Sequence, residues 1–142
     1  MRALVLLVAL LAGALAPGTA QAQELREFTQ RLTLSWARSD ASGVAARGAT
    51  TGIAMDLDGR ASGPLRSRQA AAVLRRLFDE RETLSVTVTS QKVLPGDPRR
   101  AYLELVWLRR ARGTTIPERN TVFVALVETD SSWRITEIRI LP

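Results

Sequence analysis

The sequence predicts an α+β domain in which a curved antiparallel sheet carries three helices on its concave face. Apolar residues at helical spacing mark helices in the first half of the chain. Apolar and polar residues alternate through most of the second half, and short turn sequences separate the alternating segments. Because short connections join neighbouring antiparallel strands, the second half is expected to form a meander. The expected order of elements is α-α-β-α-β-β-β-β.

The first 22 residues have the three parts of a secretory signal peptide. Arg2 provides a positive start, an apolar run follows over residues 3–16, and a small-x-small cleavage motif ends at Ala22. The run is shorter than the roughly 20 apolar residues of a membrane-spanning helix. We therefore expect residues 1–22 to be a signal peptide. Residues 23–142 would then be a single exported domain, periplasmic or secreted, with no membrane span.

Three helices are expected. In the first, residues 24–38, the apolar residues Leu25, Phe28, Leu32 and Trp36 fall on one face. Asp40, together with the serine before it, is expected to cap a short second helix over residues 41–47.

A strand over residues 53–57 should follow and enter the turn Asp58-Gly59. The longest apolar stripe then lies in a third helix that ends near Phe78, for which Ser67 is the expected N-cap.

Four strands should follow, over residues 83–94, 99–112, 119–128 and 133–141. The second and third of these strands carry apolar residues on both faces. One face can lie under the helices, and the other also needs cover, because large exposed apolar patches mark interfaces. We therefore expect a homodimer that forms through the convex face of the sheet.

The composition excludes several kinds of site. The chain has no histidine and no cysteine, which are the usual ligands of zinc and of blue copper. No metal and no cofactor is therefore expected, and any acid–base chemistry would have to use carboxylates, Tyr102 or Lys92. The formal net charge is +6, and Lys92 is the only lysine. The arginines are dispersed along the chain, so a nucleic-acid partner is not expected, and export argues against one as well.

One group of arginines is a candidate anion patch. Arg109, Arg110, Arg112 and Arg119 flank the loop between the second and third strands of the meander. A guanidinium suits phosphate and carboxylate groups, so an anionic component of the cell envelope is one interpretation. A solvated hairpin tip is the other.

Three stretches carry a resemblance to a known superfamily. They are the segment from Trp36 to Gly43, the segment from Gly63 to Phe78, and the closing segment from Trp133 to Ile140. The chain resembles the nuclear transport factor two-like superfamily, also described as a cystatin-like cone, and in particular an exported, uncharacterised bacterial branch of it. The resemblance implies a pocket between helices and sheet, which members use variously as isomerases, dehydratases, hydrolases and non-catalytic binders. Fold alone does not choose among these functions.

The resemblance suggests candidate site residues. Ketosteroid isomerase relatives use a carboxylate base with a tyrosine, and here Glu104 lies two residues from Tyr102 on the same strand face. That face either lines the cone or is convex, since the strand is apolar on both sides. Candidate ligand-binding residues are Trp36, Phe78, Tyr102, Glu104 and Val106.

A second polar pair is considered on the last strand. Strict alternation places Glu137 and Arg139 on the same face as Trp133 and Ile135. There the two charged side chains either position a substrate or are simply solvated.

Two functions stay open. One is a non-catalytic exported domain that binds an apolar small molecule or an envelope partner. The other is a cofactor-free isomerase or hydrolase that uses a carboxylate in the cone, with Tyr102 and Glu104 as the weak catalytic candidates.

Overall fold

The structure is a computed structural model that describes residues 17–142. Most of the expected signal peptide, residues 1–16, lies outside the described residues. The first helix begins at Pro17, seven residues before its expected start at Glu24. In the described part of the chain, no helix is long and apolar enough to cross a membrane.

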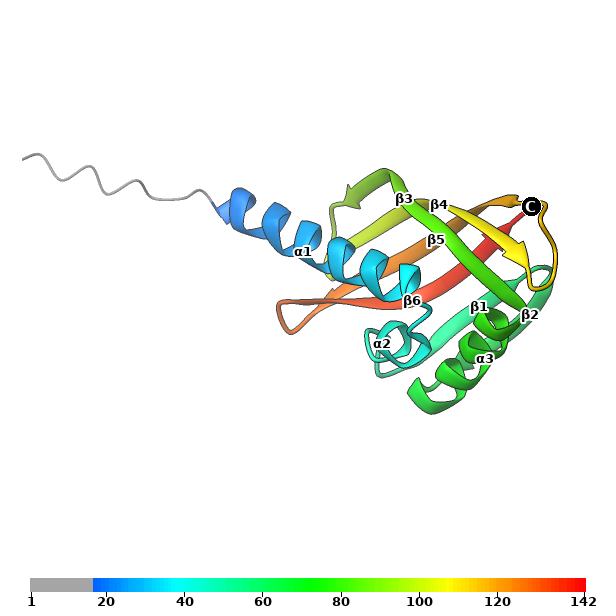
Figure 1. Ribbon diagram of the computed structural model, residues 1–142. Coiled ribbons are helices and arrows are strands. Elements are labelled where there is room, and N and C mark those ends of the chain that lie inside the picture. The colour runs from blue at the N-terminus through cyan, green and yellow to red at the C-terminus, as the bar shows by residue number, and fades with distance from the viewer. Residues whose placement is uncertain (1–16) are drawn as a thin grey trace, which may run out of the picture.

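The chain forms three helices and a six-stranded sheet, whose strand order is β2-β1-β6-β5-β4-β3. The elements are α1 (Pro17–Ala37), α2 (Ala41–Ala45), β1 (Ile53–Leu57), β2 (Arg60–Leu65), α3 (Ser67–Glu80), β3 (Arg81–Leu94), β4 (Arg100–Ala111), β5 (Glu118–Thr129) and β6 (Ser132–Leu141). Figure 1 shows α1 running along one side of a strongly curved sheet, with α2 and α3 beyond its C-terminal end. The predicted fold class and order of elements are confirmed.

The structure adds two features to the expected sheet. The strand β2 pairs with β1 through the two-residue turn Asp58-Gly59, and β1 runs parallel to β6. The sheet is therefore mixed rather than wholly antiparallel. The parallel pair arises because α3 and four strands intervene between β1 and β6, so no short turn constrains their relative direction.

The helix starts agree in part with the sequence. Asp40 caps α2 as expected, since its carboxylate accepts a hydrogen bond from the backbone N–H of Gly43 at 2.9 Å. The expected N-cap Ser67 is wrong by one residue, because Ser67 is the first residue of α3 and Arg66 is the N-cap. The Gln69 side chain accepts a hydrogen bond from the Arg66 backbone N–H, which satisfies a donor that the helix leaves free.

The concave side of the sheet is filled by the protein's own core. Trp36 of α1, Phe78 of α3 and Trp107 of β4 meet edge to face, with ring centroids 5.3–6.1 Å apart. Both tryptophans are fully buried. Edge-to-face packing is a favoured arrangement of aromatic rings, so this cluster ties two helices to the centre of the sheet.

The opposite face of the sheet is part apolar and part polar. Tyr102 of β4 stacks on Phe123 of β5, with ring centroids 5.2 Å apart, and Val106 and Leu108 continue the strip along β4. Glu104 is exposed on this face.

A β-bulge changes the pattern of the last strand. The β5–β6 register shifts between Ala125 and Leu126, so Thr136 is an extra residue in β6. Ile138 is therefore buried, while Glu137 and Arg139 point away from the core that holds Ile135. The expectation that Glu137 and Arg139 share a face with Trp133 and Ile135 is wrong, because it assumed an unbroken alternation.

Candidate functional site

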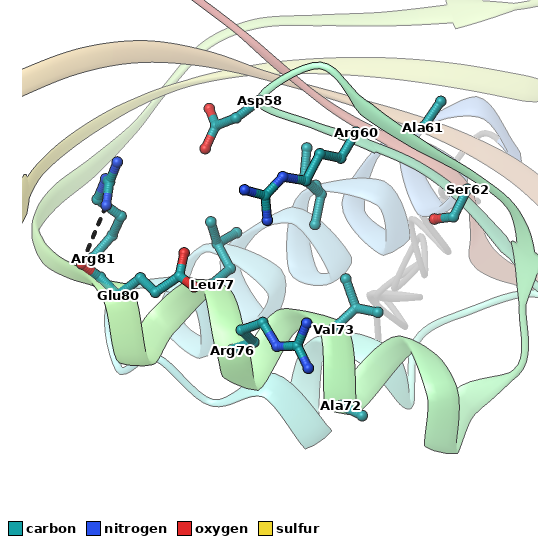
Figure 2. A pocket seen from close by; sticks show the side chains of 11 residues that line it. Asp58, Arg60, Ala61, Ser62, Ala72, Val73, Arg76, Leu77, Glu80 and Arg81 are labelled. Carbon is teal, nitrogen blue, oxygen red and sulfur yellow. Dashed lines mark hydrogen bonds between the residues drawn. The ribbon is translucent and has the colours of Figure 1, made fainter.

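An open cleft lies between the β1–β2 hairpin and α3, with a volume of about 420 Å³. Figure 2 shows hairpin residues facing α3 residues across it. Its lining residues are Leu57, Asp58, Arg60, Ala61, Ser62, Ala72, Val73, Arg76, Leu77, Glu80 and Arg81. This volume falls in the range of small-molecule sites, roughly 300–1,000 Å³.

The cleft combines apolar and charged surfaces. Leu57, Val73 and Leu77 provide apolar side chains from both sides, and Val73 is among the exposed large hydrophobic residues. Arg60 extends from β2 over the cleft, and Arg76 lies on α3 (Figure 2). Five of the eleven lining residues are charged, so the cleft can contact both an apolar and a charged part of a ligand.

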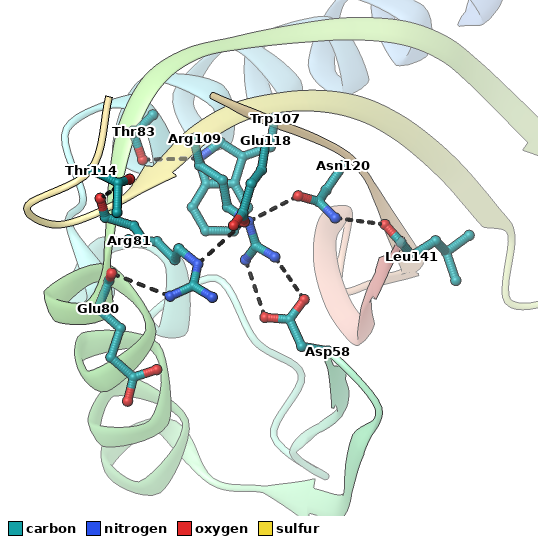
Figure 3. Close-up of polar contacts among 11 residues, drawn as sticks. Asp58, Glu80, Arg81, Thr83, Trp107, Arg109, Thr114, Glu118, Asn120 and Leu141 are labelled. Carbon is teal, nitrogen blue, oxygen red and sulfur yellow. Dashed lines mark hydrogen bonds and ion pairs between the residues drawn. The ribbon is translucent and has the colours of Figure 1, made fainter. Parts of the chain in front are cut away.

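One lining residue of the cleft, Asp58, forms an ion pair with Arg109 of β4. Both terminal nitrogens of Arg109 donate to the Asp58 carboxylate, at 2.8 and 3.2 Å, as Figure 3 shows. The Arg109 side chain is only 3% exposed, whereas that of Asp58 is 40% exposed. A two-point contact of this kind fixes the position of both groups.

Three further groups hold Arg109 in place. Its Nε donates to the side-chain oxygen of Asn120 at 2.9 Å and lies 3.4 Å from a carboxylate oxygen of Glu118. The guanidinium also lies over the ring of Trp107, 4.7 Å from the centroid. Glu118 in turn lies 3.4 Å from Nε of Arg81, a residue of the cleft wall. Arg109 thus connects the cleft to the aromatic cluster of the core.

The turn at Asp58-Gly59 places the Asp58 carboxylate. Asp58 and Gly59 have φ angles of 54° and 81°. A two-residue hairpin loop of type I′ needs positive φ at both positions, and Asp-Gly is one of the sequences that adopt it readily. The turn therefore brings the hairpin tip to Arg109 on β4.

The structure separates the candidate ligand-binding residues into two groups. Trp36 and Phe78 are buried in the core, whereas Tyr102, Glu104 and Val106 lie on the other face of the sheet. None of the five lines the cleft. Glu104 therefore faces away from the cone, which was the second of the two orientations left open by the sequence.

The four arginines of the candidate anion patch do not form one patch. Arg109 is buried and points into the concave side. Arg110 donates to Glu82 at 2.8 Å, and this hydrogen bond lowers the pKa of Glu82. Arg112 donates to the backbone oxygens of Asp79 and Phe78, while Arg119 is exposed. The alternation of β4 sends Arg109 and Arg110 to opposite faces, which explains the dispersal.

The sequence contains one signal for the hairpin that forms one wall of the cleft. Asp58-Gly59 between two extended segments is a strong hairpin signal. The turn was predicted but the strand after it was not, because Gly63 and Pro64 make the following segment a poor strand candidate. Proline is tolerated in an edge strand, and β2 is at the edge of the sheet.

The cleft contains two carboxylates, Asp58 and Glu80. Both oxygens of Asp58 accept hydrogen bonds from Arg109. Among the described residues, no three acidic, histidine or cysteine side chains are grouped so that they could hold a metal ion.

The fold is a cystatin-like cone whose interior is filled by core side chains. Its open cleft, between the β1–β2 hairpin and α3, is called the mouth of the cone below. Solved structures with this fold are similar to the chain. A DUF4783 family protein from Bacteroides uniformis has a TM-score of 0.65 and 11% identity, over 78% of this chain and 93% of that one. A cystatin-like domain of unknown function from Nostoc punctiforme has a TM-score of 0.65 and 18% identity, over 86% and 76%.

A third similar structure contains a bound small molecule. A protein with a ketosteroid isomerase-like fold from Catenulispora acidiphila, in complex with trimethylamine, has a TM-score of 0.63 and 16% identity, over 82% of this chain and 85% of that one. No model of a known protein family matches the sequence, and no curated protein matches it. These likenesses establish the fold and agree with the resemblance found in the sequence.

The Asp58–Arg109 pair should contribute measurably to stability. The variant Asp58→Asn keeps a residue that tolerates positive φ but removes the charge that Arg109 faces. Breaking a fully buried ion pair costs roughly 3–5 kcal/mol, and the exposure of Asp58 reduces our expectation to about 1–2 kcal/mol. Urea unfolding measures this loss.

The matched control is Asp130→Asn. Asp130 has a φ of 50° in the β5–β6 turn and is exposed. Its substitution should change the free energy of unfolding by less than about 0.5 kcal/mol. Equal effects of the two substitutions would show that the Asp58–Arg109 contact adds nothing.

Proposed function

We propose that this protein is an exported, non-catalytic domain that binds a small, largely apolar molecule in the cleft between the β1–β2 hairpin and α3. One observation carries the proposal. The interior of the cone is occupied by Trp36, Phe78 and Trp107, whereas the cleft of about 420 Å³ at its mouth is open. A ligand has room in the cleft and none in the cone. The small molecule in the Catenulispora structure belongs to that protein, but it is consistent with binding by this fold.

The alternative, a cofactor-free isomerase or hydrolase, has less support. Its candidate residues Tyr102 and Glu104 lie on the sheet face away from the helices, and Tyr102 stacks on Phe123. A general base works within hydrogen-bond reach of a held substrate. Glu104 is exposed and does not belong to the cleft.

The binding proposal can be tested with octanol as a neutral apolar probe. In methyl NMR spectra of the purified chain, octanol should shift the signals of Leu57, Val73 and Leu77, which line the cleft. The variant Ala72→Phe places a ring at the cleft wall and should weaken the response at least tenfold.

Ala46→Phe is the matched control, since Ala46 is an exposed alanine outside the cleft. It should leave the octanol response unchanged. A response that is equal in the two variants would place the binding elsewhere. No response at millimolar octanol would contradict the proposal.

Export is supported by the burial pattern of α1. Among the side chains of this helix whose burial is described, Leu25 is the first that is buried, and Gln21, Ala22, Gln23 and Glu24 are exposed. Cleavage after Ala22 would therefore remove no described core side chain.

When the full chain is expressed in a Gram-negative host, we expect the protein in the periplasmic fraction with the mass of residues 23–142. Intact-mass spectrometry of each fraction checks this. The variant Ala22→Arg should block cleavage, because the site requires a small residue. Full-length protein retained in the cytoplasm would contradict export.

A homodimer through the convex face of the sheet is part of the proposal. The strip made of Tyr102, Phe123, Val106 and Leu108 is half-buried in the single chain, and none of the helices described within residues 17–142 covers it. Burial of such a strip in a second copy would remove apolar surface from water.

We expect a dimer at micromolar concentration and a monomer for Val106→Arg, since a buried unpaired charge is costly. Sedimentation velocity distinguishes the two states. Ile116→Arg is the control, because Ile116 is 76% exposed in the β4–β5 loop, outside the strip. A wild-type chain that sediments as a monomer would refute the dimer.

A further inference from the structure

We propose that the ligand of the cleft is a monocarboxylate with an apolar body, such as a fatty acid of medium length, and that Arg60 and Arg76 bind its carboxylate. This inference rests on the proposed function and specifies the class of ligand. It concerns two arginines outside the candidate anion patch of the hairpin.

The charged groups around the cleft differ in whether they have an ion-pair partner. Asp58 is paired with Arg109, and Arg81 lies at ion-pair distance from Glu118. Within residues 17–142, by contrast, no carboxylate lies at ion-pair distance from Arg60 or Arg76. These two guanidiniums therefore keep their hydrogen-bond donors available, and a guanidinium suits a carboxylate in shape and charge.

The positions of Arg60 and Arg76 also favour a ligand with one charged end. Arg60 comes from β2 and Arg76 from α3, so they belong to opposite walls, as Figure 2 shows. The apolar side chains of Val73 and Leu77 lie on the same helix as Arg76. A ligand whose hydrocarbon part contacts Val73 and Leu77 would place its charged end near the two arginines.

The charges of the residues that line the cleft also favour a ligand with a single negative charge. Three arginines and two carboxylates line the cleft, so one positive charge is in excess. Glu80, one of the two carboxylates, would repel a second negative charge on a ligand. A single negative charge fits this balance better than the double charge of a phosphate monoester.

The test compares three eight-carbon probes that differ in their head group. By isothermal titration calorimetry on the purified chain, octanoate should bind at least tenfold more tightly than octanol, and octylammonium should bind more weakly than octanol. Raising NaCl from about 20 mM to about 500 mM should weaken the binding of octanoate and not of octanol, because salt screens exposed charges.

The double variant Arg60→Gln/Arg76→Gln should bring the affinity for octanoate to within about twofold of that for octanol, because both charged donors are removed. Arg68→Gln is the matched control, since Arg68 is an exposed arginine of α3 that does not line the cleft. It should leave both affinities unchanged. Amide NMR spectra establish that each variant is folded.

The outcomes separate the two proposals. Equal binding of octanoate and octanol, or an unchanged affinity for octanoate in the double variant, would overturn the carboxylate inference and leave an apolar binding site. Failure of all three probes to bind at millimolar concentration would also overturn the proposed function. The expected order of affinities, lost in the double variant alone, would support both.

Discussion

The buried guanidinium of Arg109 is the group on which the position of the β1–β2 hairpin depends. A charge that is 3% exposed requires partners, and three residues from two elements provide them: Asp58 from the β1–β2 turn, and Asn120 and Glu118 from β5. Its stacking over Trp107 adds a link to the core. Because Asp58 can reach Arg109 only from the hairpin tip, the pair holds the hairpin opposite α3.

The division between a filled interior and an open mouth follows from the size of the core residues. Trp36, Trp107 and Phe78 occupy the space that curvature creates between sheet and helices. Protein interiors pack closely, so three large rings leave no room for a ligand there. The cleft lies between the β1–β2 hairpin and α3, and none of the three rings lines it. The position of the large rings therefore decides where a molecule can enter.

The sequence predicted the elements whose patterns are regular and missed what departs from regularity. Leu25, Leu32 and Trp36 at helical spacing are all buried in α1, and the alternation through β4 and β5 is equally clear. Because of the bulge at Thr136, Glu137 and Arg139 lie on the face opposite to the predicted one. Nothing in the local composition indicates this extra residue. The candidate site was not predicted, because its residues come from a hairpin, a helix and two strands that lie far apart in the sequence. Arg109 shares its face with Leu103, Leu105 and Trp107, and this alternation could have indicated that it points inward.

The two outer strands of the sheet both depart from regular pairing geometry. Pro64 in β2 offers no backbone N–H, and the preceding Gly63 weakens the strand further. At the other side, β3 is interrupted by two register shifts, between Thr83 and Ser85 and between Val88 and Ser90. Irregularities of this kind discourage another chain from extending a sheet by adding a strand. Both edges of the sheet therefore offer an irregular backbone to an added strand.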